Sequence, residues 1–268
     1  MTLNPRSKSP TARLLSPAPW CALALALSAA ASPAVVLYDP ALGSLPAAQG
    51  WLSTGIGSIS QGVSGGIYSL DTTAFAATQW GNAQTLSATP LDTQVGFDLN
   101  FRLRVLSEDH GSNVNRAGFS VLFTGADPTH SLELAFWSDR AWAYHYDANL
   151  GSPFVQGVGA ALDTTAWIDY ALQVRSQQFT LWAGSTLLMS GPLENYTAQG
   201  APYSGANFLF IGDDTSSARA AVQLGAVTLA AVPEPGSALL MLAGGLLVAW
   251  RRSRRSGAGI EPARPVLA

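Results

Sequence analysis

The stretch Val95-Gly96-Phe97-Asp98-Leu99-Asn100-Phe101-Arg102-Leu103-Arg104-Val105 alternates between two kinds of side chain. Its odd-numbered positions are all apolar, whereas its even-numbered positions are glycine, aspartate, asparagine or arginine. Because successive side chains of a strand point to opposite faces, this period of two predicts a β-strand. One face of that strand is expected to be buried and the other to be solvated.

Short apolar or alternating runs continue through the middle of the chain, with turn signals between them. Asp127-Pro128 and Ser138-Asp139-Arg140 are two such turns, and residues 38–51 are expected to form an extended start and a loop. Many short strands with turns about every ten residues indicate an all-β sandwich. The predicted strands are 67–70, 95–105, 117–123, 131–137, 141–146, 168–174, 178–183, 186–190, 208–212 and 222–229.

Several of these strands are similar to those of a known sandwich fold. The similarity rests on Ala117 to Phe123, Leu132 to Trp137, Phe179 to Gly184, Phe210 to Thr215 and Leu224 to Val227. These segments resemble the concanavalin A-like jelly roll of laminin-G, legume-lectin and laminarinase-type domains. The resemblance implies a jelly-roll sandwich that covers most of the middle of the chain.

A narrower resemblance rests on the start of this region. Leu37-Tyr38-Asp39, the run Leu45 to Trp51 and the ending already quoted are similar to the "choice-of-anchor" surface proteins of bacteria. In that group, similar ectodomains carry interchangeable C-terminal anchors. The group implies no settled activity, so this resemblance predicts an architecture and leaves the biochemical role open.

The C-terminal region has the three parts of a short membrane anchor. Prolines 233 and 235 exclude a helix before Gly236, and residues 236–250 are apolar enough for a transmembrane helix. That helix would be about 22 Å long, short of the ~30 Å hydrocarbon core. Trp250 lies at the predicted membrane boundary, and the basic cluster after it predicts a cytoplasmic C-terminus. The cluster consists of Arg251, Arg252, Arg254 and Arg255.

This region resembles the PEP-CTERM sorting signal of Gram-negative bacteria. The literal Pro233-Glu234-Pro235, the short apolar span and the basic end occur in the expected order within residues 232–255. The resemblance implies recognition by an exosortase in the membrane, and export in a bacterium that makes extracellular polysaccharide. The same tail is also labelled as an ice-binding protein C-terminal domain, a label that describes the tag alone. Residues 256–268 are expected to be disordered.

The N-terminal residues 1–34 have the features of a secretory signal peptide. Arg6, Lys8 and Arg13 precede an apolar run from Trp20 to Ala31, and no acidic residue occurs before Asp39. An uncleaved N-terminal membrane helix is the alternative. The only cysteine of the chain lies inside the apolar run, so the mature protein is expected to have neither disulfides nor thiolate chemistry.

The middle region, residues 35–231, is strongly acidic. It holds six arginines, no lysine and fifteen acidic residues, which gives a formal charge of −9. A domain with this charge is not expected to bind nucleic acid through phosphate contacts. It is long enough for one large all-β domain.

The sequence argues against catalysis by the carboxylate pair that laminarinase-type glucanases use. Such enzymes carry Glu-x-Asp-x-x-Glu on one strand, because two carboxyl groups about 5–5.5 Å apart are needed for retention. Here Glu133 is the only acidic residue of the corresponding strand, and Ala135 and Ser138 occupy the partner positions. We therefore predict that the chain is not an enzyme and assign no catalytic residue.

Two kinds of ligand contact are predicted from single residues. Glu133, Trp137, Trp142 and Tyr144 are candidate glycan contacts, since aromatic faces stack on pyranose rings; the alternative is that the aromatics fill the core. Asp213-Asp214 is a candidate calcium site, with a solvated turn as the alternative. No other cofactor is predicted.

These observations predict a protein exported through the inner membrane, tethered by its C-terminal helix, and then located at the cell surface or outside the cell. Its expected partners are an exosortase, the membrane and extracellular polysaccharide, and its expected role is structural, adhesive or glycan-binding. The alternative is a secreted carbohydrate-active enzyme, a glycoside hydrolase or lyase, on the same fold. That alternative requires a second carboxyl group close to Glu133 in the folded protein.

Overall fold

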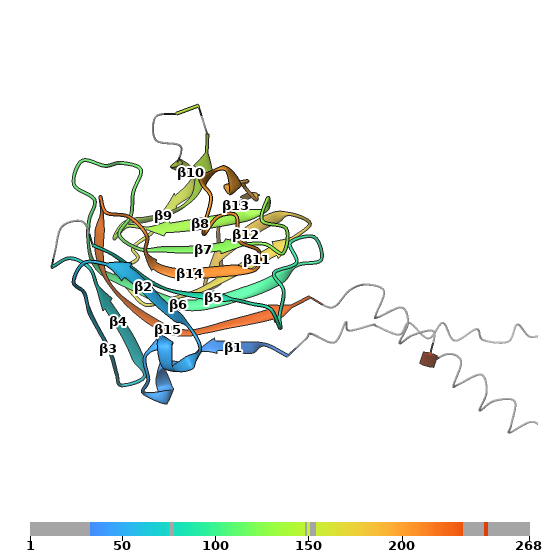
Figure 1. Cartoon of the computed structure of the whole chain (residues 1–268), viewed down its shortest axis with the longest axis horizontal. Helices are drawn as coiled ribbons and strands as arrows, with labels where there is room; N and C mark the ends of the chain where they lie inside the picture. The colour runs from blue at the N-terminus through green and yellow to red at the C-terminus, as the bar shows by residue number, and fades with distance from the viewer. Residues whose placement is uncertain (1–32, 75–77, 148, 151–153, 233–243, 246–268) are drawn as a thin grey trace, which may run out of the picture.

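The computed structural model describes residues 33–74, 78–147, 149–150, 154–232 and 244–245. Within these residues the protein is a sandwich of two antiparallel sheets (Figure 1). Three short 3₁₀ helices lie in the connections: η1 (Pro40–Leu42), η2 (Pro46–Gln49) and η3 (Thr197–Gln199). The all-β class predicted from the sequence is confirmed.

The first sheet, sheet A, has eight strands built around β6 and β15. Its order is β13 (Thr186–Pro192), β12 (Gln178–Ala183), β11 (Ile168–Arg175), β6 (Phe97–Asp109), β15 (Arg219–Ala231), β4 (Ile67–Asp71) and β3 (Ser60–Ser64). The short strand β1 (Val35–Tyr38) also pairs with β15. As a result, the first and last strands of the described domain lie side by side (Figure 1).

The second sheet, sheet B, has seven strands and carries the candidate site. Its order is β10 (Phe154–Ala161), β9 (Arg140–Tyr146), β8 (Ser131–Phe136), β7 (Ser120–Thr124), β14 (Phe208–Asp213), β5 (Gln79–Thr85) and β2 (Leu52–Ile56). Strand β14 pairs with β7 and β5, although it follows them by more than eighty residues in the chain. Its C-terminal end is thereby brought to the middle of the sheet.

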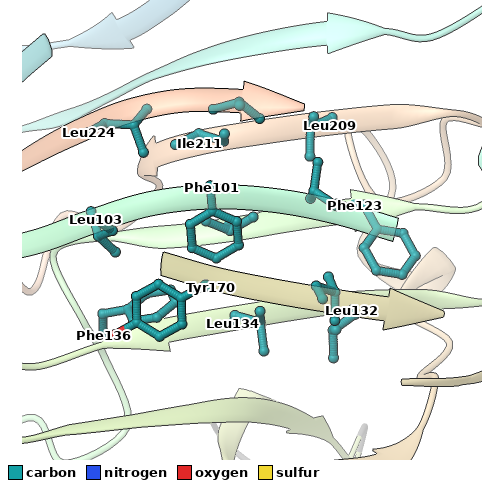
Figure 2. Packing of buried hydrophobic residues seen from close by; sticks show 14 of the residues in the cluster. Phe101, Leu103, Phe123, Leu132, Leu134, Phe136, Tyr170, Leu209, Ile211 and Leu224 are labelled. Atoms are coloured by element: carbon teal, nitrogen blue, oxygen red, sulfur yellow. The ribbon is translucent and has the colours of Figure 1, made fainter. Parts of the chain in front are cut away.

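The main core lies between the two sheets and contains the apolar face of β6. Phe97, Leu99, Phe101, Leu103 and Val105 are each at most 2% exposed, as their alternation predicts. Aromatic rings of β6 meet rings of sheet B edge to face: Phe97 packs on Phe123 and Phe101 on Phe136 (Figure 2). Burial of such rings is worth about 1.5–3 kcal/mol each, so this interface stabilises the sandwich.

A second, smaller core lies on the outer face of sheet B. It contains outward-pointing side chains of several strands, and residues 194–207 cross over it. Tyr196 of that segment is fully buried, and its hydroxyl donates to the backbone oxygen of Tyr144 at 3.0 Å. The members of this core are Ala83, Ala117, Leu122, Ala135, Trp142, Tyr144, Phe154, Tyr196 and Phe210. Residues 194–207, here called the roofing segment, therefore cover part of this face, and a hollow remains beside them.

The predicted strands between residues 67 and 229 are present, with small shifts at their ends, and so are the two predicted turns. The last two predicted strands, 208–212 and 222–229, belong to different sheets: β14 lies in sheet B and β15 in sheet A. No helix among the described residues is long and apolar enough to cross a membrane. The predicted signal peptide lies outside the described residues except for its last two, and so does the helix 236–250 except for Gly244 and Gly245.

Candidate functional site

A polar pocket of about 380 Å³ opens on the outer face of sheet B, beside the segment that roofs it. Strands β8 and β9 supply its floor, and the residues that follow β14 supply one wall. Its lining consists of Gln79, Arg116, Glu133, Tyr144, Phe154, Gln199, Tyr203, Asp214, Thr215, Ser216 and Ser217. The volume falls in the range of small-ligand sites in proteins.

Glu133 lies at the centre of this pocket because of its register on β8. Leu132 and Leu134 point into the main core, so the side chain between them must point outward. It is nevertheless only 3% exposed. Burial, the neighbouring charge of Asp214 and a hydrogen bond to Asp214 all raise the pKa of Glu133 well above its ordinary value. The protonated form of Glu133 is therefore favoured more than that of an ordinary glutamate.

Asp214 provides the second carboxyl group. It is the first residue after β14, and it is half-buried. The hydroxyl of Tyr203, from the roofing segment, lies 3.3 Å from Glu133 Oε2 and 3.4 Å from Asp214 Oδ2. One hydroxyl thus contacts both carboxyl groups, and burial raises the pKa of Tyr203 so that it stays protonated. The nearby charge of Asp214 therefore disfavours ionisation of Glu133.

Arg116 is the cation of the pocket. Its guanidinium lies over the rings of Tyr144 and Phe154, at 5.7 Å and 5.6 Å from their centroids. The backbone at this position is fixed by the indole of Trp137, whose Nε1 donates to the carbonyl oxygen of Arg116 at 2.7 Å. The charge of Arg116 opposes the rise in the pKa of Glu133 but does not reverse it.

The predicted glycan contacts lie on one face, and two of them line the pocket. Glu133 and Tyr144 are lining residues, whereas Trp137 and Trp142 are not. Trp142 is fully buried and meets the Trp137 ring edge to face at 4.9 Å. Trp137 also forms a parallel stack with His110 at 3.8 Å. The two tryptophans therefore pack beside the pocket, as part of the layer that supports it.

The two aspartates of the predicted calcium site have different partners. The carboxylate of Asp213 accepts from the hydroxyl of Thr72 at 2.7 Å, and Asp214 faces Tyr203. Among the residues that the structure describes, no group of three or more His, Cys, Asp or Glu side chains converges as metal ligands would. Asp214 belongs with Glu133, which the sequence did not indicate.

The role of Asp214 was missed because the two carboxyl groups are far apart in the chain. A strand motif was expected to supply both acids, and Glu133 is the only acid on β8. Pairing of β14 with β7, the neighbour of β8, brings Asp214 to the same place. Arg116 and Tyr203 come from loops and carry no local signal either. The one local signal for Asp214 in the sequence was its position just after a predicted strand, next to Gly212-Asp213.

Comparison with known families identifies the C-terminal segment. Residues 231–255 match the family described as the PEP-CTERM protein-sorting motif. The chain carries a PEP-CTERM sorting motif. This motif implies export from the cytoplasm, sorting from the membrane and processing by an exosortase. It covers Pro233-Glu234-Pro235 and the arginine cluster, whose structure lies outside the described residues.

Solved structures support the sandwich fold. The carbohydrate esterase of Shiga toxin-encoding bacteriophage phi24B is 16% identical, covers 75% of this chain and 100% of its own, and has a TM-score of 0.53. A protein of unknown function from Shewanella oneidensis MR-1 is 16% identical, with 83% and 96% covered and a TM-score of 0.45. Family 7 alginate lyase A1-II' is 10% identical, with 75% and 93% covered and a TM-score of 0.43. Comparison with curated proteins found no match.

The likeness to the carbohydrate esterase shows a shared fold and supports the concanavalin A-like assignment only loosely. It also overturns one prediction: the expectation that the chain is not an enzyme is corrected, because the fold is shared with a carbohydrate esterase. The argument behind that expectation fails as well. It rested on the absence of a second acid beside Glu133, and the structure has Asp214 there.

Proposed function

We propose that this protein is an exported, exosortase-sorted surface protein that binds a glycan in the pocket on sheet B and cleaves it by acid–base catalysis. The observation that carries the proposal is the buried Glu133, at the floor of an open pocket, joined to Asp214 by a Tyr203 hydroxyl that contacts both carboxyl groups. A carboxyl group kept neutral by its surroundings is a proton donor suited to a leaving group.

The reaction proposed is hydrolysis of a glycosidic bond. Glu133 gives its proton to the leaving oxygen as the bond between that oxygen and the sugar carbon breaks. The carboxylate of Asp214 forms a bond to the same carbon, which gives a covalent glycosyl–enzyme intermediate, as a carboxyl pair at short range allows. In the second half of the reaction Glu133 takes a proton from a water molecule whose oxygen bonds to that carbon as the bond to Asp214 breaks, so Glu133 is protonated again and Asp214 is again a carboxylate. Tyr203, which contacts both carboxyl groups, holds the pair in this geometry.

Binding of a sugar ring at this place is supported by the aromatic side chains of the pocket. Tyr144, Phe154 and Tyr203 are lining residues, and aromatic faces pack against the apolar face of a pyranose. Gln79 and Gln199 add donors and acceptors for hydroxyl groups. These same features favour a second candidate function, glycan binding without cleavage, in an adhesive or matrix role.

One experiment separates the two functions. The full chain, purified in a mild detergent, is incubated with a panel of bacterial extracellular polysaccharides, and new reducing ends and binding are both measured. We expect cleavage by the parent, and Glu133→Gln is expected to lower its rate about 10²–10⁴-fold while binding persists. Glu108→Gln is the matched control, because Glu108 is also buried but lies outside the pocket and contacts His110.

The outcomes are distinct. Cleavage that survives in Glu133→Gln would refute the acid role of Glu133. Binding of a polysaccharide without cleavage by the parent would refute the enzymatic proposal and leave the binding function. Equal losses in Glu133→Gln and Glu108→Gln would mean that burial of a carboxyl group matters to the fold and not to chemistry.

A further inference from the structure

Arg116 lines the pocket and is one of three arginines of the described domain without an ion pair there, Arg104 and Arg140 being the others, neither of which lines it. Three of the six, Arg102, Arg175 and Arg219, form ion pairs with aspartates. The ion pairs among the described residues do not include Arg116, although its pocket contains two carboxyl groups. Its positive charge is therefore not committed to a partner within the described part of the chain.

The hydrogen bonds of Arg116 are also weak. Its Nη1 reaches only two backbone oxygens, those of Asn115 and Phe154, at 3.4 Å and 3.5 Å. These distances are at the long limit for a hydrogen bond from nitrogen. A guanidinium has five N–H donors in a planar fork, and the fork matches a carboxylate in two parallel hydrogen bonds. The side chain thus presents unused donors to the pocket.

The surroundings hold this guanidinium in place without neutralising it. It lies over the Tyr144 and Phe154 rings, and contacts of this kind attract a cation while leaving the edge of the fork free. The backbone of Arg116 is tied to the Trp137 indole. A fixed, half-buried cation with free donors is arranged for an anionic ligand of matching geometry.

We propose that the pocket takes an acidic sugar, a uronic acid unit of a polysaccharide, and that Arg116 binds its carboxylate. The proposal rests on the glycan function proposed for the same pocket and specifies its substrate class. A uronic acid carries a planar carboxylate on a pyranose ring, so one unit satisfies the guanidinium and packs its ring against Tyr203. The ring is then held next to Glu133 and Asp214, which line the same pocket.

Because the domain is acidic, binding of an anionic polymer depends strongly on the positive charge of Arg116. Residues 35–231 carry a formal charge of −9, and a polyanion is repelled by such a surface. A uronate polymer therefore needs a specific positive contact to bind, and Arg116 is the arginine that lines the pocket. Binding of an acidic glycan is accordingly expected to depend on Arg116 far more than binding of a neutral one.

The test uses matched pairs of polymers and needs no variant in its first arm. Polygalacturonate, alginate and hyaluronan are compared with their carboxyl-reduced forms, which are neutral and otherwise alike, for binding to the detergent-purified full chain. We expect at least one acidic polymer to bind about tenfold or more tightly than its reduced form. Failure of every acidic polymer to exceed its reduced form would overturn the inference.

The second arm changes the protein. Arg116→Met is expected to lose that preference, and Arg116→Lys to retain part of it, because lysine keeps the charge but not the fork. Arg102→Met, an exposed arginine of sheet A, is the control and is expected to bind as the parent does. Retention of the full preference in Arg116→Met would overturn the inference, and so would an equal loss for acidic and reduced polymers. The first arm decides the matter if Arg116→Met does not fold.

Failure of this inference and failure of the proposed function are distinguishable. Cleavage of a neutral glycan at a rate that Arg116→Met leaves unchanged would retain the acid–base function and overturn the uronate inference. Arg116-dependent binding of a uronate polymer without any cleavage would retain the inference and overturn the enzymatic proposal.

Discussion

The hydroxyl oxygen of Thr72 lies 2.7 Å from the carboxylate oxygen Oδ2 of Asp213, and this contact joins the two sheets. Thr72 follows β4 of sheet A, and Asp213 ends β14 of sheet B. Both side chains are buried, and the backbone N–H of Ala220 donates to the same hydroxyl at 3.0 Å. The contact lies directly before Asp214, so it fixes the place at which the chain enters the pocket.

The first prediction concerns the pH dependence that this contact gives to stability. Burial raises the pKa of Asp213 from 3.8 to about 8, so the folded protein prefers the protonated form. Protonated Asp213 therefore adds to the free energy of unfolding. This stabilisation is fully present below pH 3.8 and is lost as the pH rises to about 8. Asp213→Asn, which mimics the neutral acid, should remove that decline, which amounts to at most about 6 kcal/mol.

Urea unfolding of the parent and of Asp213→Asn between pH 4 and pH 8 measures the effect. The variant is expected to gain stability relative to the parent as the pH rises. Asp169→Asn, an exposed aspartate on β11, is the control and should show no such trend. Parallel pH profiles for the parent and Asp213→Asn would contradict the assignment of a protonated Asp213.

The second prediction concerns Tyr203. Its hydroxyl donates toward Glu133, and this hydrogen bond lowers the pKa of Glu133 against the larger effect of burial. Tyr203→Phe removes the donor, so the pKa of Glu133 should rise further. The alkaline limb of the pH–rate profile, which reports loss of the acid form, should then move to higher pH. A limb that stays in place or moves to lower pH would exclude a hydrogen bond from Tyr203 to the catalytic acid.

Much of the fold was predictable because burial of one face of a strand produces a local alternation of apolar and polar residues in the sequence. The alternation of residues 95–105 identified β6. Strands β1, β2, β3, β5 and β10 were not predicted. Asn82 of β5 points inward and donates to the Tyr68 hydroxyl, so the buried face of β5 is not uniformly apolar. Strand β10 contains Gly157 and Gly159, which interrupt the alternation of apolar and polar residues. Strands such as these can be recognised only from the partners with which they pair in the assembled sheet.

The site was less predictable than the fold, since its parts come from separate segments. Glu133 lies on β8, Arg116 on the loop before β7, Tyr203 on the roofing segment and Asp214 after β14. Only the antiparallel pairing of β14 with β7 brings the two carboxyl groups together. A sequence pattern reports neighbours on one strand, and no two of these four groups share a strand. The sequence therefore indicated Glu133 and gave Asp214 a different role.

The third prediction concerns Gly118, which lies between Arg116 and β7. A Cβ at this position would lie 2.0 Å from the backbone carbon of Arg219 and 2.3 Å from the nitrogen of Ala220. Because these atoms belong to the backbone of β15, they cannot move away cheaply. Gly118→Ala is expected to destabilise the protein by about 1–3 kcal/mol. It should also weaken glycan binding, since the backbone that carries Arg116 must shift.

Thermal unfolding and glycan binding check this prediction together. Gly62→Ala on β3 is the matched control, since no atom lies within 4 Å of its added Cβ. That variant should change the stability by less than about 1 kcal/mol, and any change is expected to be stabilising. Equal stabilities of the two variants would refute the close approach of Gly118 to β15.

The last prediction concerns delivery by the sorting motif. Strand β15 ends at Ala231, and the N–H of Val232 donates to the backbone oxygen of Gly96 at 3.1 Å. Deletion of residues 233–255 therefore removes the motif and leaves every pairing of the sandwich in place. Fractionation of cells that express this deletion should find the protein released from the envelope, with glycan binding intact. Replacement of Pro233-Glu234-Pro235 by three alanines tests the motif alone: the protein should then stay in the membrane unprocessed. A deletion variant that remains with the envelope as the parent does would exclude sorting by this segment.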